Sequence, residues 1–504
     1  MTNIRWTLIG QMWTWSMAFV LATVLPRRLG AADVGRLYSS QAIWLIVAAI
    51  AAFGTDALIV RSAAADPATL GPIRRGALAA RGLMLIVLWP VAAITLWVLG
   101  PRSLSVGLVV GVATSATVVG NVWRSILHGR EQLAAIAAID GGVKMVLVGG
   151  VLGLLLADAP LALIASAWIP PAVLSALGFL IISRRSGTGD VDSSSLPWRH
   201  ALREGWPYFA TTGAVMIYHQ IDVVVIALFG DEDATGWYGA ADQLYTSVYF
   251  ISTAALASVL PAMFRIAKRS PSEIDDMARV GLGLMVTAAV PIGLGLVVTG
   301  GDIARLVFGA EFDAAGAILA LMGLAVVPTY AATFLGQMAI VLGESALWAR
   351  LMLGAAFATA AIDVVVVPAT QRWFSNGGLG GAISYILVET AVAIVGLQRL
   401  RPAIVDRKLL MGLVRALAAG LVMLLCVLLV DGWWLGLRVT VGALVYVAAA
   451  IMFDVLTPSQ RALIAEASPR HRMIQSLIRG PYRRRSTHDI DGNDTNEESV
   501  DAPR

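Results

Sequence analysis

The sequence predicts an all-α polytopic membrane protein that crosses the bilayer about fourteen times. The first observation is composition: 58% of the 504 residues are hydrophobic and only 14% are charged, whereas soluble domains carry about 25% charged residues. The second is that apolar stretches of the length a spanning helix needs, roughly 20 residues, follow one another along the chain. The third is that Lys and Arg gather in alternate loops between these stretches.

Fourteen apolar stretches meet the length requirement. The first follows Arg5 and is interpreted as an uncleaved helix rather than a signal peptide, because no small residues suited to cleavage follow it and further spans do. The tenth contains Pro328, which predicts a kink or tilt. The predicted spans are residues 7–25, 37–59, 82–100, 104–123, 134–157, 160–183, 206–229, 239–263, 280–299, 314–342, 347–367, 379–398, 410–430 and 435–454.

Basic residues divide unequally between the loops of this map. Of the 37 Lys and Arg side chains, 29 lie in loops on the side of the amino terminus and seven lie on the opposite side. The remaining one, Lys144, lies within a span. The positive-inside rule assigns the richer side to the cytoplasm, so both termini are expected to be cytoplasmic.

Two short patterns recur six spans apart. The segment 29–38 (LGAADVGRLY) follows the first span, and the segment 229–238 (FGDEDATGWY) follows the seventh, with Gly, Asp, Gly and Tyr in the same order. Leu-Gly at 99–100 is echoed by Phe-Gly at 308–309. Repeats of this kind are typical of secondary transporters, whose substrate site lies between the repeats. The predicted organisation is a six-helix lobe (1–183), a cytoplasmic linker (184–205), a second six-helix lobe (206–398), an additional helix pair (410–454) and a cytoplasmic tail (457–504).

Several motifs, in this order and spacing, resemble a known family. They are Arg28-Leu29-Gly30 with Gly35 and Tyr38; Phe53-Gly54-Thr55-Asp56-Ala57 with Val60-Arg61; Ile221-Asp222 with Gly236-Trp237-Tyr238-Gly239-Ala240-Ala241; Leu260-Pro261 with Phe264-Arg265; and Leu306-Val307-Phe308-Gly309 with Phe312 and Ala315. From about residue 5 to 400 the chain resembles the polysaccharide transporters, which are O-antigen-type lipid-linked oligosaccharide flippases. These belong to the multidrug/oligosaccharidyl-lipid/polysaccharide exporter superfamily.

The resemblance implies a two-lobe carrier in the bacterial cytoplasmic membrane. Such a carrier moves a polyprenyl-diphosphate-linked oligosaccharide from the inner to the outer leaflet by alternating access, for cell-surface polysaccharide or lipopolysaccharide biosynthesis. A diphosphate and its sugars cannot cross hydrocarbon unaided, because removing water from a charge is costly. Two alternatives remain: a cation-coupled multidrug exporter of the same superfamily, and a non-transporting scaffold with the same fold. The added helix pair and a basic residue within a span favour the lipid-linked anion.

Basic residues in or beside the spans are candidate contacts for the substrate diphosphate. Lys144 lies near the centre of a span, where it could contact the substrate. Alternatively, Lys144 could form an i,i+4 ion pair with Asp140 that neutralises both side chains. Arg61, Arg124 and Arg265 end the second, fourth and eighth spans. Their alternative role is to anchor the helix ends at lipid head groups.

Acidic and polar residues form a second candidate set. His219 and Asp222 are three residues apart and share a helix face in the seventh span. They could line a polar cavity or bind a proton, or simply join two helices. Asp242, and Asp56 beside Arg61, lie near span ends, and Asp56 is expected to pair with Arg61 or cap a helix.

The sequence predicts no enzyme, cofactor or metal site. It has no Gly-x-x-x-x-Gly-Lys-Ser/Thr phosphate loop, no His-Glu-x-x-His pair and only one cysteine, Cys426. The expected partners are the lipid bilayer, the lipid-linked glycan, and a glycan polymerase or glycosyltransferases of the same pathway, without nucleic acid. The tail is basic and then acidic, and is expected to lie on the inner leaflet and then become disordered.

Overall fold

The computed structural model describes residues 2–65, 67–185, 197–267, 271–400, 404–457 and 460–461. These residues form helices, and no strand occurs among them, so the all-α prediction is confirmed for this part of the chain. Eleven of the described helices are long and apolar enough to cross a membrane. The chain is therefore a multi-pass membrane protein, and the count of fourteen spans stays a prediction. Most of the tail after Thr457 lies outside the described residues.

The amino-terminal half, defined here as residues 2–185, begins with a helix that joins two predicted spans. Helix α1 contains the first predicted span and most of the second, which is interrupted after Ala52 by Phe53 and Gly54 at positive φ. Inside α1 the only non-helical residue is Gly30, with φ 79° and ψ 169°. A side chain at that φ would be strained, so glycine allows the turn. The helices of this half are α1 (Thr2–Ala52), α2 (Thr55–Ala65), α3 (Pro67–Val98), α4 (Pro101–Gly129), α5 (Leu133–Leu156), α6 (Leu161–Ser166) and α7 (Ile169–Arg185).

The predicted linker is partly helical. Helix α8 (Trp198–Tyr208) begins inside the range 184–205 that was expected to be a loop, while residues 186–196 lie outside the described part. Its polar and apolar residues separate onto two faces because apolar residues recur at helical spacing. A five-residue π-helical turn, Phe209–Gly213, joins α8 to α9 (Ala214–Phe229). Such turns interrupt α-helices mostly at functional sites.

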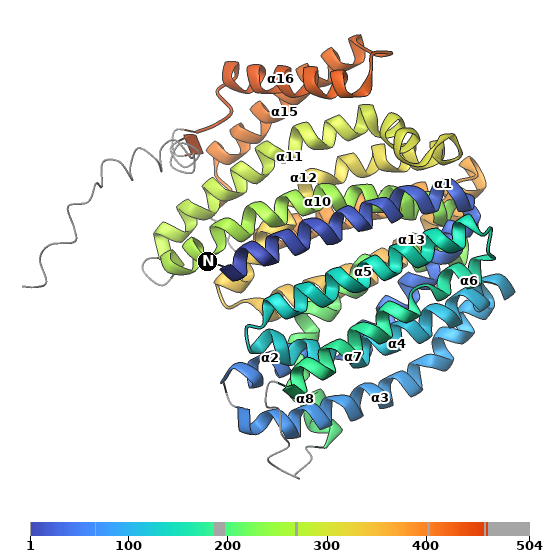
Figure 1. The fold of residues 1–504 in the computed structure, drawn as a ribbon. Helices are drawn as coiled ribbons and strands as arrows, with labels where there is room; N and C mark the ends of the chain where they lie inside the picture. The colour runs from blue at the N-terminus through green and yellow to red at the C-terminus, as the bar shows by residue number, and fades with distance from the viewer. Residues whose placement is uncertain are drawn as a thin grey trace, which may run out of the picture. The chain divides into compact units, whose positions relative to one another are not determined.

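The carboxyl-terminal half, residues 197–457, continues with long helices. Helices α15 and α16 pack against α11 and form a separate pair beside it (Figure 1). Tyr446 of α16 donates a hydrogen bond to the Thr287 carbonyl of α11, at 2.7 Å. The remaining helices are α10 (Glu232–Ala267), α11 (Pro271–Phe308), α12 (Asp313–Val341), α13 (Ser345–Phe374), α14 (Gly377–Leu400), α15 (Arg407–Leu429) and α16 (Leu435–Met452).

One of the two sequence echoes has the same backbone geometry at both positions. Gly100 has φ 113° and ψ 166°, and Gly309 has φ 97° and ψ 176°. Both precede a helical segment and adopt angles that a side chain would oppose. This likeness supports the internal repeat, whereas Gly30 and Gly230 differ, with φ 79° and −95°. The division into two six-helix lobes stays a prediction.

Candidate functional site

The two halves meet where α1 crosses α10, at two glycines. A Cβ added at Gly35 would lie 1.9 Å from the Glu232 carbonyl oxygen, and one added at Gly236 would lie 2.0 Å from the Ala31 carbonyl oxygen. Real Cβ atoms do not approach other atoms so closely. Only glycine therefore permits this crossing, which brings together the two echoed segments of the sequence.

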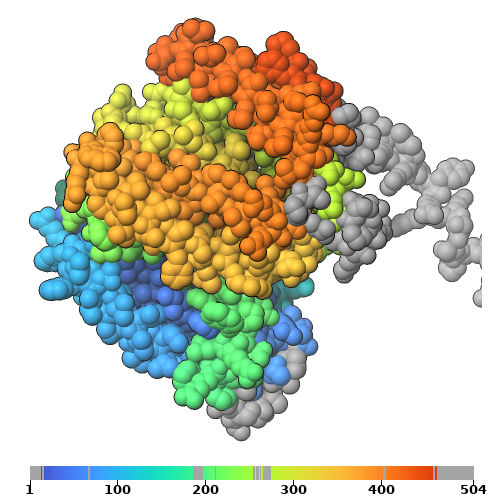
Figure 2. All heavy atoms as spheres, turned by 180° about the vertical axis from the view of Figure 1, so that it is seen from behind, coloured from blue at the N-terminus to red at the C-terminus, as the bar shows by residue number. Residues whose placement is uncertain are grey.

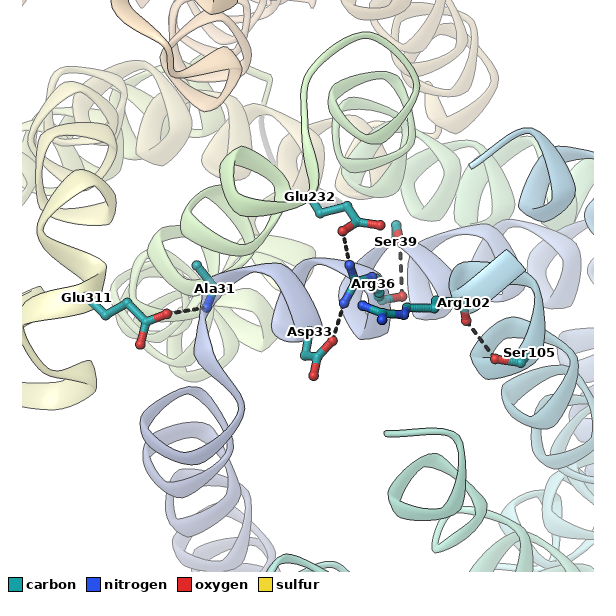
Figure 3. Close-up of polar contacts among 8 residues, drawn as sticks. All are labelled: Ala31, Asp33, Arg36, Ser39, Arg102, Ser105, Glu232 and Glu311. Atoms are coloured by element: carbon teal, nitrogen blue, oxygen red, sulfur yellow. Dashed lines mark hydrogen bonds and ion pairs between the residues drawn. The ribbon is translucent and has the colours of Figure 1, made fainter. Parts of the chain in front are cut away.

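Polar contacts surround the glycine crossing (Figure 3). Arg36 of α1 forms ion pairs with Asp33 and with Glu232 at the start of α10. The Ala31 amide donates to Glu311 Oε1 at 3.2 Å. The hydroxyl of Tyr38, on α1, donates to Gln243, which lies farther along α10. We call the crossing and these contacts the seal, because they join the two halves at one end of the molecule.

A cavity of about 710 Å³ lies on the other side of the seal along α1. The seal occupies residues 31–38 of α1, and the cavity is lined by α1 from Gln41 to Ala52. Its other walls come mainly from α4 and α7, with further residues from α2, α3, α5, α8, α9 and the π-helical turn between α8 and α9. In Figure 2 the dark-blue atoms of α1 lie in a recess between the light-blue and the orange helices. The lining side chains that carry polar groups include Gln41, Asp56, Thr114, Thr117, Asn121 and Ser175.

Asp56 pairs with Arg81 beside this cavity, and not with Arg61 as expected. Arg81 Nη2 donates to Asp56 Oδ1 at 2.7 Å, and the Arg81 side chain has no exposed surface. Arg81 also donates to the Thr55 hydroxyl at 2.8 and 3.0 Å and to the Val118 carbonyl at 2.6 Å. From the sequence alone, Arg81 is one of the 29 basic residues assigned to the amino-terminal side. A buried arginine must be hydrogen-bonded to offset its desolvation, and these contacts fulfil that need.

Lys144 has no ion-pair partner among the described residues. The alternative interpretation, an ion pair with Asp140, is not observed, because Asp140 Oδ2 lies 3.0 Å from Nη2 of Arg124 on the neighbouring helix α4. Val143 and Leu147, one residue before Lys144 and three after it on α5, line the cavity. Lys144 is half-buried, so a mid-span cation lies next to the cavity without a counter-charge.

Arg61 lies outside the described lining of the cavity. Arg61 of α2 donates to the Tyr208 hydroxyl at 3.4 Å, and Tyr208 lines the cavity. This hydrogen bond raises the pKa of Arg61 above its ordinary value, so the side chain stays charged. Arg265 belongs to α10, but its side chain is outside the described part of the structure.

His219, Asp222 and Asp242 lie in a separate region of the carboxyl-terminal half, where Asp222 is buried and the other two are half-buried. The Tyr238 hydroxyl donates to Asp222, and the rings of Tyr218 and His219 lie 5.3 Å apart. None of the three predicted residues lines the 710 Å³ cavity. The structure thus places Lys144 and Arg61 beside the cavity, and His219, Asp222 and Asp242 away from it.

Two further carboxylates, not predicted from the sequence as site residues, belong to this acidic region. Asp363 of α13 is fully buried, and neither of its carboxylate oxygens has a hydrogen-bond partner in the described part of the chain. Glu389 of α14 accepts a hydrogen bond from Tyr218 at 2.8 Å, and its other oxygen is unpartnered. For both residues, the position of a carboxylate within a predicted span was the sequence feature that could have marked them as site candidates. Among the described residues no group of three or more His, Cys, Asp or Glu side chains could hold a metal ion.

Comparison with solved structures identifies the fold. Lipid II flippase MurJ in an inward closed conformation superposes with a TM-score of 0.73 at 12% identity, over 89% of this chain and 98% of that one. An inward-facing multidrug resistance MATE family transporter of the MOP superfamily gives 0.58 at 14% identity, over 78% and 94%. A MOP superfamily transporter from Pyrococcus furiosus gives 0.53 at 15% identity, over 80% and 95%. No curated protein sequence matches the chain.

The chain therefore has the fold of the lipid II flippase MurJ, which it shares with MATE family transporters of the MOP superfamily. The family model described as "Polysaccharide biosynthesis protein" matches residues 1–267. The chain belongs to this family, as its sequence motifs predicted.

Proposed function

We propose that the protein flips a polyprenyl-diphosphate-linked oligosaccharide from the inner to the outer leaflet of the bacterial cytoplasmic membrane. Alternating access of two lobes, 1–183 and 206–398, would carry the head group while the lipid tail remains in the bilayer. The product would then be available to a polymerase or glycosyltransferases of cell-surface polysaccharide synthesis.

The observation that carries the proposal is the polar cavity next to an unpaired, mid-span Lys144. A lysine at the bilayer centre costs about 2.5–3.5 kcal/mol on insertion scales. No neighbouring carboxylate offsets that cost, because Asp140 is paired with Arg124. A substrate diphosphate would supply the missing anion, with Arg61 and Arg265 attracting it from the mouth.

The orientation of the described conformation is inferred from the charges. The cavity lies toward the end of α1 that leads to α2, where Arg61, Arg74 and Arg75 are concentrated. The positive-inside rule makes this end cytoplasmic and the seal external. The described conformation would then be one in which the outer end is closed.

The buried acidic region supports coupling to a proton or cation. A buried carboxylate with no cationic partner is costly unless it is protonated or binds a cation. Asp222, Asp242, Asp363 and Glu389 form no ion pair in the described structure and are the candidates for this role. A cation-coupled drug exporter would share this feature, so the substrate must be tested directly.

The test is flipping of a fluorescent lipid-linked oligosaccharide in proteoliposomes, read with a reagent that reaches only the outer leaflet. Lys144→Ala is expected to lower the rate at least about tenfold, equivalent to about 1.4 kcal/mol, while Lys144→Arg retains part of it. The matched control is Lys408→Ala, which removes an exposed lysine at the start of α15. A folded Lys144→Ala variant that flips at the wild-type rate would refute the role of Lys144. No flipping by the wild type would refute the function.

A further inference from the structure

The cavity beside α1 presents neutral hydrogen-bonding groups to a ligand. Amides of Gln41 and Asn121 and hydroxyls of Thr114, Thr117 and Ser175 belong to its lining. Trp168 and Tyr208 add aromatic rings. Hydroxyl and amide groups donate and accept, and the volume lies in the range of small-molecule sites, roughly 300–1,000 Å³. These properties match an uncharged, hydroxyl-rich ligand better than an anion.

The two charged residues of the cavity wall differ in what a ligand can reach. Arg81 has no exposed side-chain surface, and its guanidinium is bonded to Thr55, Asp56 and Val118. Asp56 is 41% exposed. Its Oδ1 accepts from Arg81 at 2.7 Å and from Ser125 at 2.9 Å. No hydrogen bond engages Oδ2 in the described structure, so the charged atom that a ligand can reach is a carboxylate oxygen, although the Asp56–Arg81 pair is neutral as a whole.

We infer that this cavity binds a neutral sugar unit of the lipid-linked glycan, with Asp56 accepting its hydroxyl groups. Arg81 is a positioning residue: it holds the Asp56 carboxylate in place without touching the ligand. A carboxylate oxygen accepts hydrogen bonds from sugar hydroxyls and repels a second anion at short range, so the diphosphate would lie outside the cavity, near Lys144. This inference rests on the proposed function and adds the sugar class that the site selects.

Three probes separate the sugar from the lipid diphosphate: bare undecaprenyl diphosphate, the same lipid with a neutral disaccharide, and the same lipid with a disaccharide containing one uronic acid. Binding is measured to the full-length protein in nanodiscs. The neutral disaccharide is expected to raise the affinity at least about tenfold over the bare lipid, which corresponds to two or three hydrogen bonds. The acidic disaccharide is expected to raise it less than about threefold.

Two variants test the lining. In Thr114→Val with Thr117→Val, the gain from the neutral disaccharide should fall below about threefold. The matched control is Thr95→Val on α3. The Thr95 hydroxyl donates to the carbonyl four residues earlier, as the Thr117 hydroxyl does, but Thr95 is not part of the cavity lining. Asp56→Asn keeps an oxygen for Arg81 and Ser125 but removes the charge. It should therefore raise the affinity for the acidic disaccharide, an effect that a purely structural role would not produce.

The outcomes distinguish this inference from the proposed function. Equal affinity for the bare and the neutral-disaccharide lipid would overturn the sugar site and leave the flippase proposal intact. An unchanged preference for the neutral disaccharide in Asp56→Asn would overturn the role of Asp56. If no polyprenyl diphosphate binds, while tetraphenylphosphonium binds to the wild type and not to Asp56→Asn, both proposals are overturned in favour of a cation exporter.

Discussion

Gly35→Ala should open the end of the molecule that the seal closes. The added Cβ would lie 1.9 Å from the Glu232 carbonyl, whereas ordinary contacts begin at 3.4 Å, so α1 and α10 must separate by about 1.5 Å. Overpacking of this kind costs about 1–3 kcal/mol. The cost applies only while the seal is closed, so the ratio of open to closed molecules should rise about 5- to 150-fold.

A buried serine behind the seal can report this change. Ser39 lies one helical turn after Gly35 and is 3% exposed, so it shares the face that meets α10. Cys426 is the only cysteine, and its replacement by serine gives a cysteine-free background for Ser39→Cys. A membrane-impermeant maleimide added from outside should label this reporter faster in Gly35→Ala than in the parent.

The matched control is Gly82→Ala on α3, where an added Cβ would meet no atom within 4 Å. This change should leave the labelling rate unaltered and stabilise the helix by roughly 0.5–1 kcal/mol. Folded Gly35→Ala that labels at the parental rate would refute the argument that the crossing forms the seal. Faster labelling only from the inner side would show that the orientation is reversed.

Three further predictions follow from buried contacts and loop charges. Arg81→Met should lower the free energy of unfolding by about 3–5 kcal/mol, because it leaves Asp56 without its cationic partner; thermal unfolding in detergent measures it, and Arg102→Ala, at an exposed arginine, should have no such effect. Tyr238→Phe removes the hydrogen bond to buried Asp222 and should cost about 1–3 kcal/mol in the same assay; an unchanged melting temperature would contradict that bond. Topology reporters fused after residues 232, 310 and 374 should score external and those after 190, 272 and 404 cytoplasmic; external scores for the last three would disprove the predicted map.

The apolar stretches and the charges of the loops between them were sufficient to predict the helical fold, because both can be recognised without knowing how the helices pack together. The family was also accessible, since its glycine motifs perform a task that only glycine allows. Gly35 and Gly236 were read as parts of an echo, and the structure shows each backbone lying within contact distance of the other helix. The motif order thus anticipated the family, although not the reason for the glycines.

The site residues were harder to predict because they depend on packing between distant segments. Arg81 ends a polar segment and looks like an ordinary cytoplasmic charge, yet it is buried against Thr55 and Asp56, 26 and 25 residues away. Spacing along one helix suggested that Asp140 pairs with Lys144, but the α4–α5 contact brings Arg124 to Asp140 instead. Helical spacing lists the possible neighbours of a charge, and tertiary packing selects among them.

The arrangement of α10 gives a physical route between the buried carboxylates and the seal. Gly236 forms the crossing with α1, and two residues later on the same helix Tyr238 bonds Asp222 of α9. Any displacement of α10 that separates Gly236 from α1 must therefore either carry α9 with it or break the Tyr238–Asp222 bond. Protonation or cation binding at Asp222 changes the strength of that bond, since a carboxylate is the stronger acceptor. The charge state of the acidic region would in this way bias the opening of the seal. It would thereby also influence the side of the membrane from which the cavity beside α1 can be reached.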